Sequence, residues 1–184
     1  MTSINIFISA LAMGLMTVGA HGFELTSADV SPTKPIAEDF VFNGFGCSGK
    51  NISPSLVWTN APKGSKSFAV LVHDPDAPTG GGGFWHWVVV NLPVSTAGLS
   101  QGAGTADGVK LPVGTKQIAT DFGTPGWGGP CPPAGKPHRY IFTVYALKTE
   151  KLDLPANATA SLTGFMVNAN ALGKASFTSR YGRK

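Results

Sequence analysis

The chain has 184 residues and a mass of 19.0 kDa, the size of one ordinary domain with its own hydrophobic core. Only 13% of the residues are charged, and 24 glycines and 14 prolines interrupt the sequence, which favours short strands and turns over long helices. The formal charge is +4, but the cations are scattered outside the tail (Arg180, Arg183 and Lys184), so we expect no binding to nucleic acid.

Residues 1–22 have the features of a signal peptide. Residues 4–18 are apolar and uncharged, and small residues follow at two possible cleavage sites, so a mature chain would start at His21 or Phe23. The segment before the apolar run lacks Lys and Arg, and a buried N-terminal element is the alternative. The run is shorter than the roughly 20 residues of a spanning helix, so we expect no stable membrane insertion and a periplasmic or secreted protein.

Strand-like runs dominate the rest of the chain. Expected strands, from their β-branched and aromatic residues, are 23–30, 39–42, 55–59, 67–73, 86–92, 139–147 and 175–181. The turn at 60–64 predicts a hairpin between its two flanking strands. Residues 86–92 are apolar on both faces and belong in the interior of a sheet. Residues 93–123 show no period and are expected to form long loops.

The sequence predicts one long helix, which starts near Asn157 and can end at Gly173. Its expected apolar face repeats at intervals of three and four residues: Leu162, Phe165, Met166, Ala169 and Leu172. With no internal repeat and no second core, residues 23–184 are expected to form one mainly β domain. The predicted architecture is an antiparallel β-sandwich-like domain with a C-terminal helix.

Two segments combine polar side chains with loops stiffened by proline. Residues 73–87 contain D-P-D-A-P, four glycines and a histidine between two tryptophans, and residues 128–140 read GGPCPPAGKPHRY. In both segments a strand end meets a rigid loop, so polar groups are presented in fixed positions at one rim of a sheet. This arrangement predicts a pocket.

These segments resemble the signatures of the phosphatidylethanolamine-binding family, including its bacterial Raf-kinase-inhibitor-like branch. The matching motifs are D-P-D-A-P at 74–78, H-W-V-V-V-N at 86–91 and G-P-C-P-P-A-G-K-P-H-R-Y-I-F at 129–142, and the glycine-rich loop at 44–54 fits the same branch. The resemblance covers residues 23–183 and is weak over 93–123.

The resemblance implies an anion-binding pocket and no catalytic residues. Its ligand-binding residues would be Asp74, Asp76, Pro78, His86, Gly129, Pro132, His138 and Tyr140. Imidazoles and a phenol can donate hydrogen bonds to a phosphate, and the carboxylates can orient the imidazoles or accept an ammonium group. We therefore expect a non-enzymatic protein that binds a small phosphate-bearing or anionic ligand and needs no cofactor. Family behaviour adds a possible kinase or protease partner.

Cys47 and Cys131 are the two cysteines, and neither belongs to a C-x-x-C pair that would indicate zinc or redox chemistry. In an oxidising compartment two thiols either pair or are buried. Because both lie in Gly- and Pro-rich loops beside the candidate site, we expect a disulfide.

Three alternatives compete with the anion pocket. Asp74 and Asp76 could serve only as turn residues that bond the backbone. The Asp and His side chains could instead hold a metal, or act as acid and base, in a hydrolase, although the sequence contains no G-x-S-x-G or H-E-x-x-H motif. Residues 44–49 match G-x-G-x-x-G, but no helix follows to bind a pyrophosphate, so a dinucleotide site is rejected.

Overall fold

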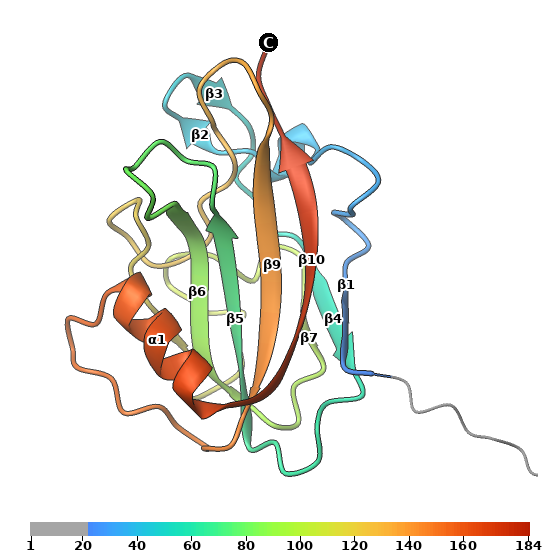
Figure 1. Cartoon of the computed structure of the whole chain (residues 1–184), viewed down its shortest axis with the longest axis vertical. Helices are drawn as coiled ribbons and strands as arrows, with labels where there is room; N and C mark the ends of the chain where they lie inside the picture. Colours follow the sequence, from blue (N-terminus) through green and yellow to red (C-terminus); the bar gives the residue numbers. More distant parts are fainter. Residues whose placement is uncertain (1–21) are drawn as a thin grey trace, which may run out of the picture.

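The computed structural model describes residues 22–184, and the predicted signal peptide lies almost entirely outside this range. A five-stranded and a three-stranded antiparallel sheet pack on each other, and one helix near the C-terminus, α1 (Ala160–Asn170), covers the outer face of the larger sheet (Figure 1). The mainly β, sandwich-like fold is confirmed. No helix among residues 22–184 is long and apolar enough to span a membrane.

The larger sheet has the strand order β10-β9-β5-β6-β8. Its strands are β5 (Ser67–Asp74), β6 (Phe84–Pro93), β8 (Lys116–Gln117), β9 (His138–Leu147) and β10 (Ala171–Tyr181). The apolar run at 86–92 forms the centre of β6, between two other strands, as predicted. Strand β10 starts four residues before the predicted strand at 175–181.

The smaller sheet contains β1 (Glu24–Thr26), β4 (Leu56–Thr59) and β7 (Gly98–Leu99). The hairpin predicted around 60–64 is wrong, because β4 pairs with β1 and β7 while β5 pairs with β6 and β9. The burial patterns of β4 and β5 explain why the two strands join different sheets. β4 alternates between buried and exposed positions, as in a sheet with one solvated face, whereas β5 is almost continuously buried.

The predicted strand at 39–42 is also wrong. Glu38–Phe40 forms a short 3-10 helix, and the backbone N–H of Phe42 donates to the carbonyl of Pro130. The indole of Trp127 donates to the carbonyl of Phe40. These backbone groups are satisfied by a distant loop and not by a neighbouring strand. The next residues form a small hairpin of β2 (Asn43–Gly44) and β3 (Cys47–Ser48).

Two apolar layers hold the sandwich together, because successive residues of a strand point to opposite faces. Val70, Val72 and Phe142 of the larger sheet form one core with Leu56 and Trp58 of the smaller sheet. The other face of the sheet presents a second apolar layer to α1: Leu71, Val88, Val90, Tyr145 and Leu147, with Val167 of the helix. Full burial of each large apolar side chain contributes roughly 1.5 to 3 kcal/mol.

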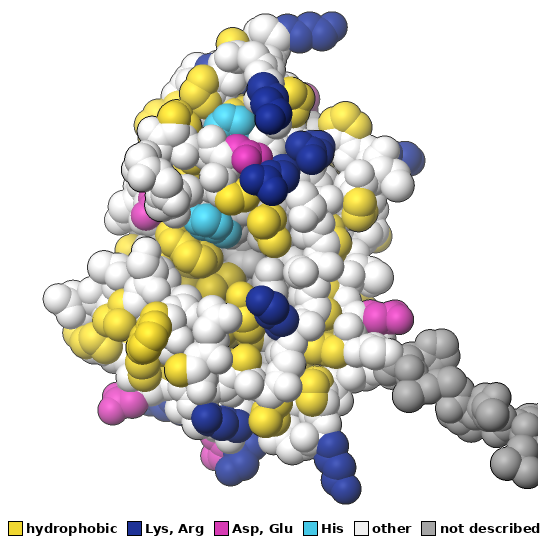
Figure 2. All heavy atoms as spheres, in the orientation of Figure 1, with side chains coloured by type: hydrophobic (Ala, Val, Ile, Leu, Met, Phe, Trp, Pro, Cys, Tyr) yellow, Lys and Arg dark blue, Asp and Glu magenta, His cyan; other side chains and the backbone are white. Residues whose placement is uncertain are grey.

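Helix α1 (Ala160–Asn170) exists as predicted but buries a different face. The side chain of Thr159 caps its first turn by accepting the N–H of Leu162. Its buried residues are Ala160, Thr163, Gly164 and Val167, because the small Gly164 lets the ring of Trp85 approach. Leu162 and Phe165 are exposed instead, and Figure 2 shows hydrophobic side chains gathered on this surface. The helix ends at Asn170, before Gly173.

Candidate functional site

A cavity of about 220 Å³ lies at the end of the larger sheet where β5 ends and β6 and β9 begin. This end of the sheet points toward the top of Figure 1. Six of the eight predicted ligand-binding residues line it: Asp74, Pro78, His86, Pro132, His138 and Tyr140. His138 and Tyr140 are two positions apart on β9 and therefore share a face of the sheet. Antiparallel pairing of β5 with β9 and β6 brings Asp74 and His86 to the same edge.

Asp74 uses both of its oxygens within the protein. One accepts the backbone N–H of Asp76 at 2.8 Å, and the other accepts a hydrogen bond from Nδ1 of His138 at 2.8 Å. Asp74 is 3% exposed, so these contacts replace water around a buried carboxylate. The residue thus closes the predicted Asx turn and also orients an imidazole in the pocket.

His86 is buried and firmly oriented. Its Nδ1 donates to the carbonyl of Gly128 at 2.6 Å, and the backbone N–H of Gly128 donates to the carbonyl of His86. Aromatic rings surround the imidazole, with Tyr140 and Phe122 edge-on at centroid distances of 5.0 and 5.5 Å. Burial lowers the pKa of His86 to about 4, although the bond to Gly128 and the charge of Asp74 act in the opposite direction.

The hydroxyl of Tyr140 is buried, and within residues 22–184 no group meets it in good hydrogen-bond geometry. Burial raises the pKa of this phenol, followed by the negative charge of Asp74 and, as the weakest cause, a strained hydrogen bond to that carboxylate, so the hydroxyl keeps its hydrogen. Buried polar groups without a partner are rare in folded proteins. The hydroxyl is therefore a donor available to a ligand in the cavity.

Two predicted residues lie outside the cavity. Asp76 forms a bidentate ion pair with Arg139, at 2.7 and 2.9 Å, and also accepts its backbone N–H. The Arg139 guanidinium holds the pKa of the Asp76 carboxyl well below its usual range. Gly129 donates its N–H to Oδ1 of Asn51 and packs against the backbone of Phe40, where a Cβ would collide. It shapes the loop behind the pocket.

The sequence did not identify the aromatic wall of the cavity, which Phe45, Phe84 and Phe122 form. Phe122 contacts both other rings, with centroids 5.9 Å from Phe45 and 4.9 Å from Phe84. It lies in the segment 93–123, which lacks any period. The one feature of the sequence that could have indicated a role for Phe122 is that it is a large aromatic residue in a glycine-rich loop.

Two long-range links hold the loops around the cavity. Cys47 and Cys131 form a disulfide that joins the β2–β3 hairpin to the cavity wall, as predicted. Arg183 donates from Nε to the carbonyl of Pro132 at 2.8 Å and from Nη1 to that of Gly46 at 3.1 Å. The C-terminal segment therefore connects the same two loops as the disulfide.

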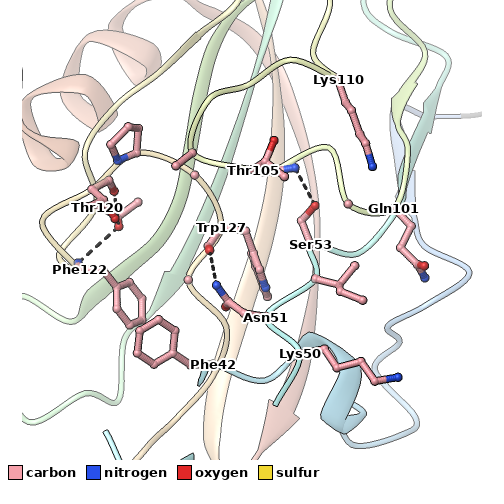
Figure 3. Close-up of a pocket in the computed structure, with 18 residues that line it drawn as sticks. Phe42, Lys50, Asn51, Ser53, Gln101, Thr105, Lys110, Thr120, Phe122 and Trp127 are labelled. Atoms are coloured by element: carbon pink, nitrogen blue, oxygen red, sulfur yellow. Dashed lines mark hydrogen bonds between the residues drawn. The ribbon is translucent and has the colours of Figure 1, made fainter. Parts of the chain in front are cut away.

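A larger cleft of about 620 Å³ lies on the other side of Phe122. Figure 3 shows Ser53 and Trp127 within it and Lys110 reaching in from one side. Its polar groups are largely satisfied by the protein, since Ser53 accepts the N–H of Gly104 and Asn51 donates to the carbonyl of Trp127. The smaller cavity, with its unpaired buried hydroxyl, is the stronger candidate site.

The metal-dependent or acid–base hydrolase alternative gains no support. Residues 22–184 contain no group of three or more His, Cys, Asp or Glu side chains placed to hold one metal ion. The acidic groups are also engaged elsewhere, Asp74 with His138 and Asp76 with Arg139.

Comparison with known proteins agrees with the motifs. The sequence profile described as "Phosphatidylethanolamine-binding protein" matches residues 26–182. The chain is 48% identical to the YbcL protein of Escherichia coli over 174 residues, which cover 94% of each chain. It is also 48% identical to YbhB of the same species, over 86% of this chain and 99% of YbhB.

Solved structures give the same result. The crystal structure of E. coli YbcL, described as a member of the mammalian PEBP family, matches with a TM-score of 0.86 and 50% identity over 89% of this chain and all of YbcL. A phosphatidylethanolamine-binding protein homologue from Chlamydia trachomatis matches with a TM-score of 0.73 and 28% identity, over 89% of this chain and 99% of the homologue. The chain therefore belongs to the phosphatidylethanolamine-binding protein family.

Proposed function

We propose that this protein binds a small phosphate-bearing anion in the cavity formed by Asp74, His86, His138 and Tyr140, and that it does so without catalysing a reaction. The buried hydroxyl of Tyr140 carries this proposal, because it is a donor that the protein leaves unpaired. A ligand oxygen in the cavity would satisfy it and recover the free energy that an unpaired polar group costs.

The cavity can hold a headgroup but not a large substrate. About 220 Å³ is below the usual range for drug-sized ligands, and the walls beyond the polar residues are aromatic rings and prolines. A tetrahedral anion with a short organic substituent fits this description. An ammonium group on the ligand could be attracted by the nearby carboxylate of Asp74.

Calorimetric titration with phosphoethanolamine tests the proposal. Tyr140→Phe removes only the unpaired hydroxyl and should weaken binding by roughly tenfold, the worth of one hydrogen bond to a charged group. His73→Asn is the matched control, because His73 is a histidine of the same sheet that bonds the carbonyl of Gly82 and does not line the cavity. Unchanged affinity in Tyr140→Phe would place the ligand elsewhere.

We also propose that the protein is exported. The predicted leader and the disulfide support this, since disulfides persist in oxidising compartments. The Mycobacterium tuberculosis protein LppC, which is named as a lipoprotein, is 39% identical over 71% of this chain and 60% of its own length. The suggested regulatory action on a kinase or a protease stays a prediction.

A further inference from the structure

The hydrogen-bond partners of His86 fix what this residue can offer a ligand. Its Nδ1 bonds the carbonyl oxygen of Gly128, which can only accept, so Nδ1 must carry a hydrogen. In the neutral ring the other nitrogen, Nε2, then has no hydrogen and is an acceptor. Within residues 22–184 no protein group donates a hydrogen bond to Nε2, and this nitrogen is not one of the fully buried unpaired atoms, as expected for a residue that lines the cavity.

The surroundings keep this imidazole neutral. Phe84, Phe122 and Trp127 pack around it, with ring centroids 5.4, 5.5 and 6.4 Å away. The titratable groups near it are Tyr140 on β9, Asp74 and His73 on β5, and Asp121 in the loop beside β6. His138 on β9 lines the same cavity and is bonded to Asp74. The two carboxylates favour the protonated ring, but burial outweighs them, and the pKa of His86 falls to about 4.

The cavity therefore combines a donor and an acceptor. The hydroxyl of Tyr140 can donate to an anionic oxygen, while Nε2 of His86 requires a hydrogen from the ligand. A phosphate monoester near pH 6 satisfies both, because it carries negative oxygens and, in about half of the molecules, one P–OH group. Sulfate has the same tetrahedral shape but no hydrogen, and a phosphodiester also has none.

We propose that His86 makes the cavity select phosphate monoesters, bound with one P–OH group, over sulfate and over phosphodiesters. This inference rests on the proposed anion-binding function and specifies its ligand class. The selectivity follows from the cost of an acceptor left without a hydrogen once the ligand has displaced water from the cavity, which is how a hydrogen-bonding site rejects an analogue that lacks the matching group. A soluble monoester is then a better ligand than the phosphodiester headgroup of an intact phospholipid.

Calorimetry at pH 6 with three ligands tests the selectivity. Phosphoethanolamine is the monoester, glycerophosphoethanolamine carries the same ammonium group on a phosphodiester, and sulfate is the anion of matched shape. The wild type should bind phosphoethanolamine roughly tenfold to a hundredfold more tightly than the other two, the usual cost of one unpaired buried group.

Two variants identify the residue responsible. In His86→Gln the side-chain amide can present either its oxygen or its nitrogen, so the preference for phosphoethanolamine over sulfate should fall to within about threefold. Tyr140→Phe should weaken all three ligands and leave the preference unchanged. A selectivity that survives in folded His86→Gln would overturn the inference.

A measurement on the wild type alone gives the same answer if His86→Gln does not fold. Raising the pH from 6 to 8 lowers the fraction of monoester that carries P–OH by roughly fiftyfold, since its pKa is near 6. The phosphoethanolamine-to-sulfate affinity ratio should fall with it, and sulfate, which keeps its charge over this range, shows how titration of the protein alone changes the binding of a dianion. Equal affinity for both anions at pH 6 refutes the selectivity alone, whereas binding of neither refutes the anion site as well.

Discussion

Asp74 accepts a 2.8 Å hydrogen bond from Nδ1 of His138, a residue 64 positions later in the chain. Asp76 follows two positions after Asp74, but its carboxylate is held by Arg139 and does not line the cavity. Two aspartates separated by a single residue thus have different partners and face different surroundings. Substituting each aspartate in turn shows whether ligand binding depends on the carboxylate in the cavity or also on the carboxylate in the partly exposed ion pair.

Asp74→Ala should weaken phosphoethanolamine binding by roughly tenfold to a hundredfold, because His138 loses the group that orients its ring. Asp76→Ala, the matched control, should change the affinity by less than about threefold, since it removes only a partly exposed ion pair. Calorimetric titration of variants with unchanged circular dichroism gives the comparison. Equal losses in both variants would mean that Asp74 has no special part in binding.

His86 should reduce the stability of the protein in acid. Its pKa is about 4 in the folded protein and 6.5 for the free group, so between these values the unfolded chain binds more protons. The stability is complete above pH 6.5 and falls with pH by on the order of 3 kcal/mol by pH 4. Urea unfolding at several pH values should show a smaller acid loss for His86→Gln than for wild type. Parallel curves would contradict the burial of a neutral imidazole.

Phe122 should control that pKa. Its ring lies edge-on to His86 and lines both the cavity of about 220 Å³ and the larger cleft. Phe122→Ala would admit water and should raise the pKa of His86 by about one unit or more, as measured by NMR titration. Phe165→Ala, on the exposed surface of α1, is the control and should leave the titration unchanged. An unshifted His86 in Phe122→Ala would show that other groups exclude the solvent.

The sequence predicted most of the strands and the central side chains of the site, and its errors have physical causes. The run 86–92 was assigned correctly because continuous apolar residues have few alternatives to an interior strand. The turn at 60–64 has the composition of a hairpin loop, but composition does not show that its flanking strands join different sheets. The face of α1 was misassigned because the small Gly164 lies close to Trp85 and the hydroxyl of the buried Thr163 donates to the carbonyl of Thr159, which periodicity of large apolar residues cannot reveal.

At the site, too, features set by local sequence were predicted and features set by long-range contacts were not. Two sequence motifs identified the central residues of the site, Asp74 and His86 in the first motif and His138 and Tyr140 in the second. The sheet then brings the two motifs together around one cavity. Asp76 could not be separated from Asp74 because its partner, Arg139, is 63 positions away. Phe122 was missed because its role depends entirely on contacts with distant rings.

The disulfide should contribute to stability and to the order of the cavity. Cys47 and Cys131 are 84 positions apart, and closing a loop of that length is worth roughly 4 to 5 kcal/mol in the chain-entropy model. The double substitution Cys47→Ser with Cys131→Ser should lower the free energy of unfolding in urea by up to this amount and weaken anion binding. A stability equal to wild type would show that other contacts, such as those of Arg183, already fix the loops.

Export should remove residues at the N-terminus, leaving a chain that begins at His21 or Phe23. Expression of the complete sequence, followed by fractionation and N-terminal sequencing, measures this directly. A variant with Leu15→Arg in the apolar run should remain unprocessed, because a charge there disrupts the hydrophobic segment. Recovery of an intact N-terminus from the cytoplasm for the unmodified chain would refute export.

The bond between Arg183 and the carbonyl of Gly46 joins residues 137 positions apart. A ribosome therefore completes nearly the whole domain before it produces the side chain that connects the two loops of the pocket. Until then the hairpin and the proline-rich loop lack this bond, whatever the state of the sheets beneath them. The first strands can pair early, but the proposed anion pocket gains this connection late, so ligand binding during synthesis would report that the segment around Arg183 has been made and not merely that the core has formed.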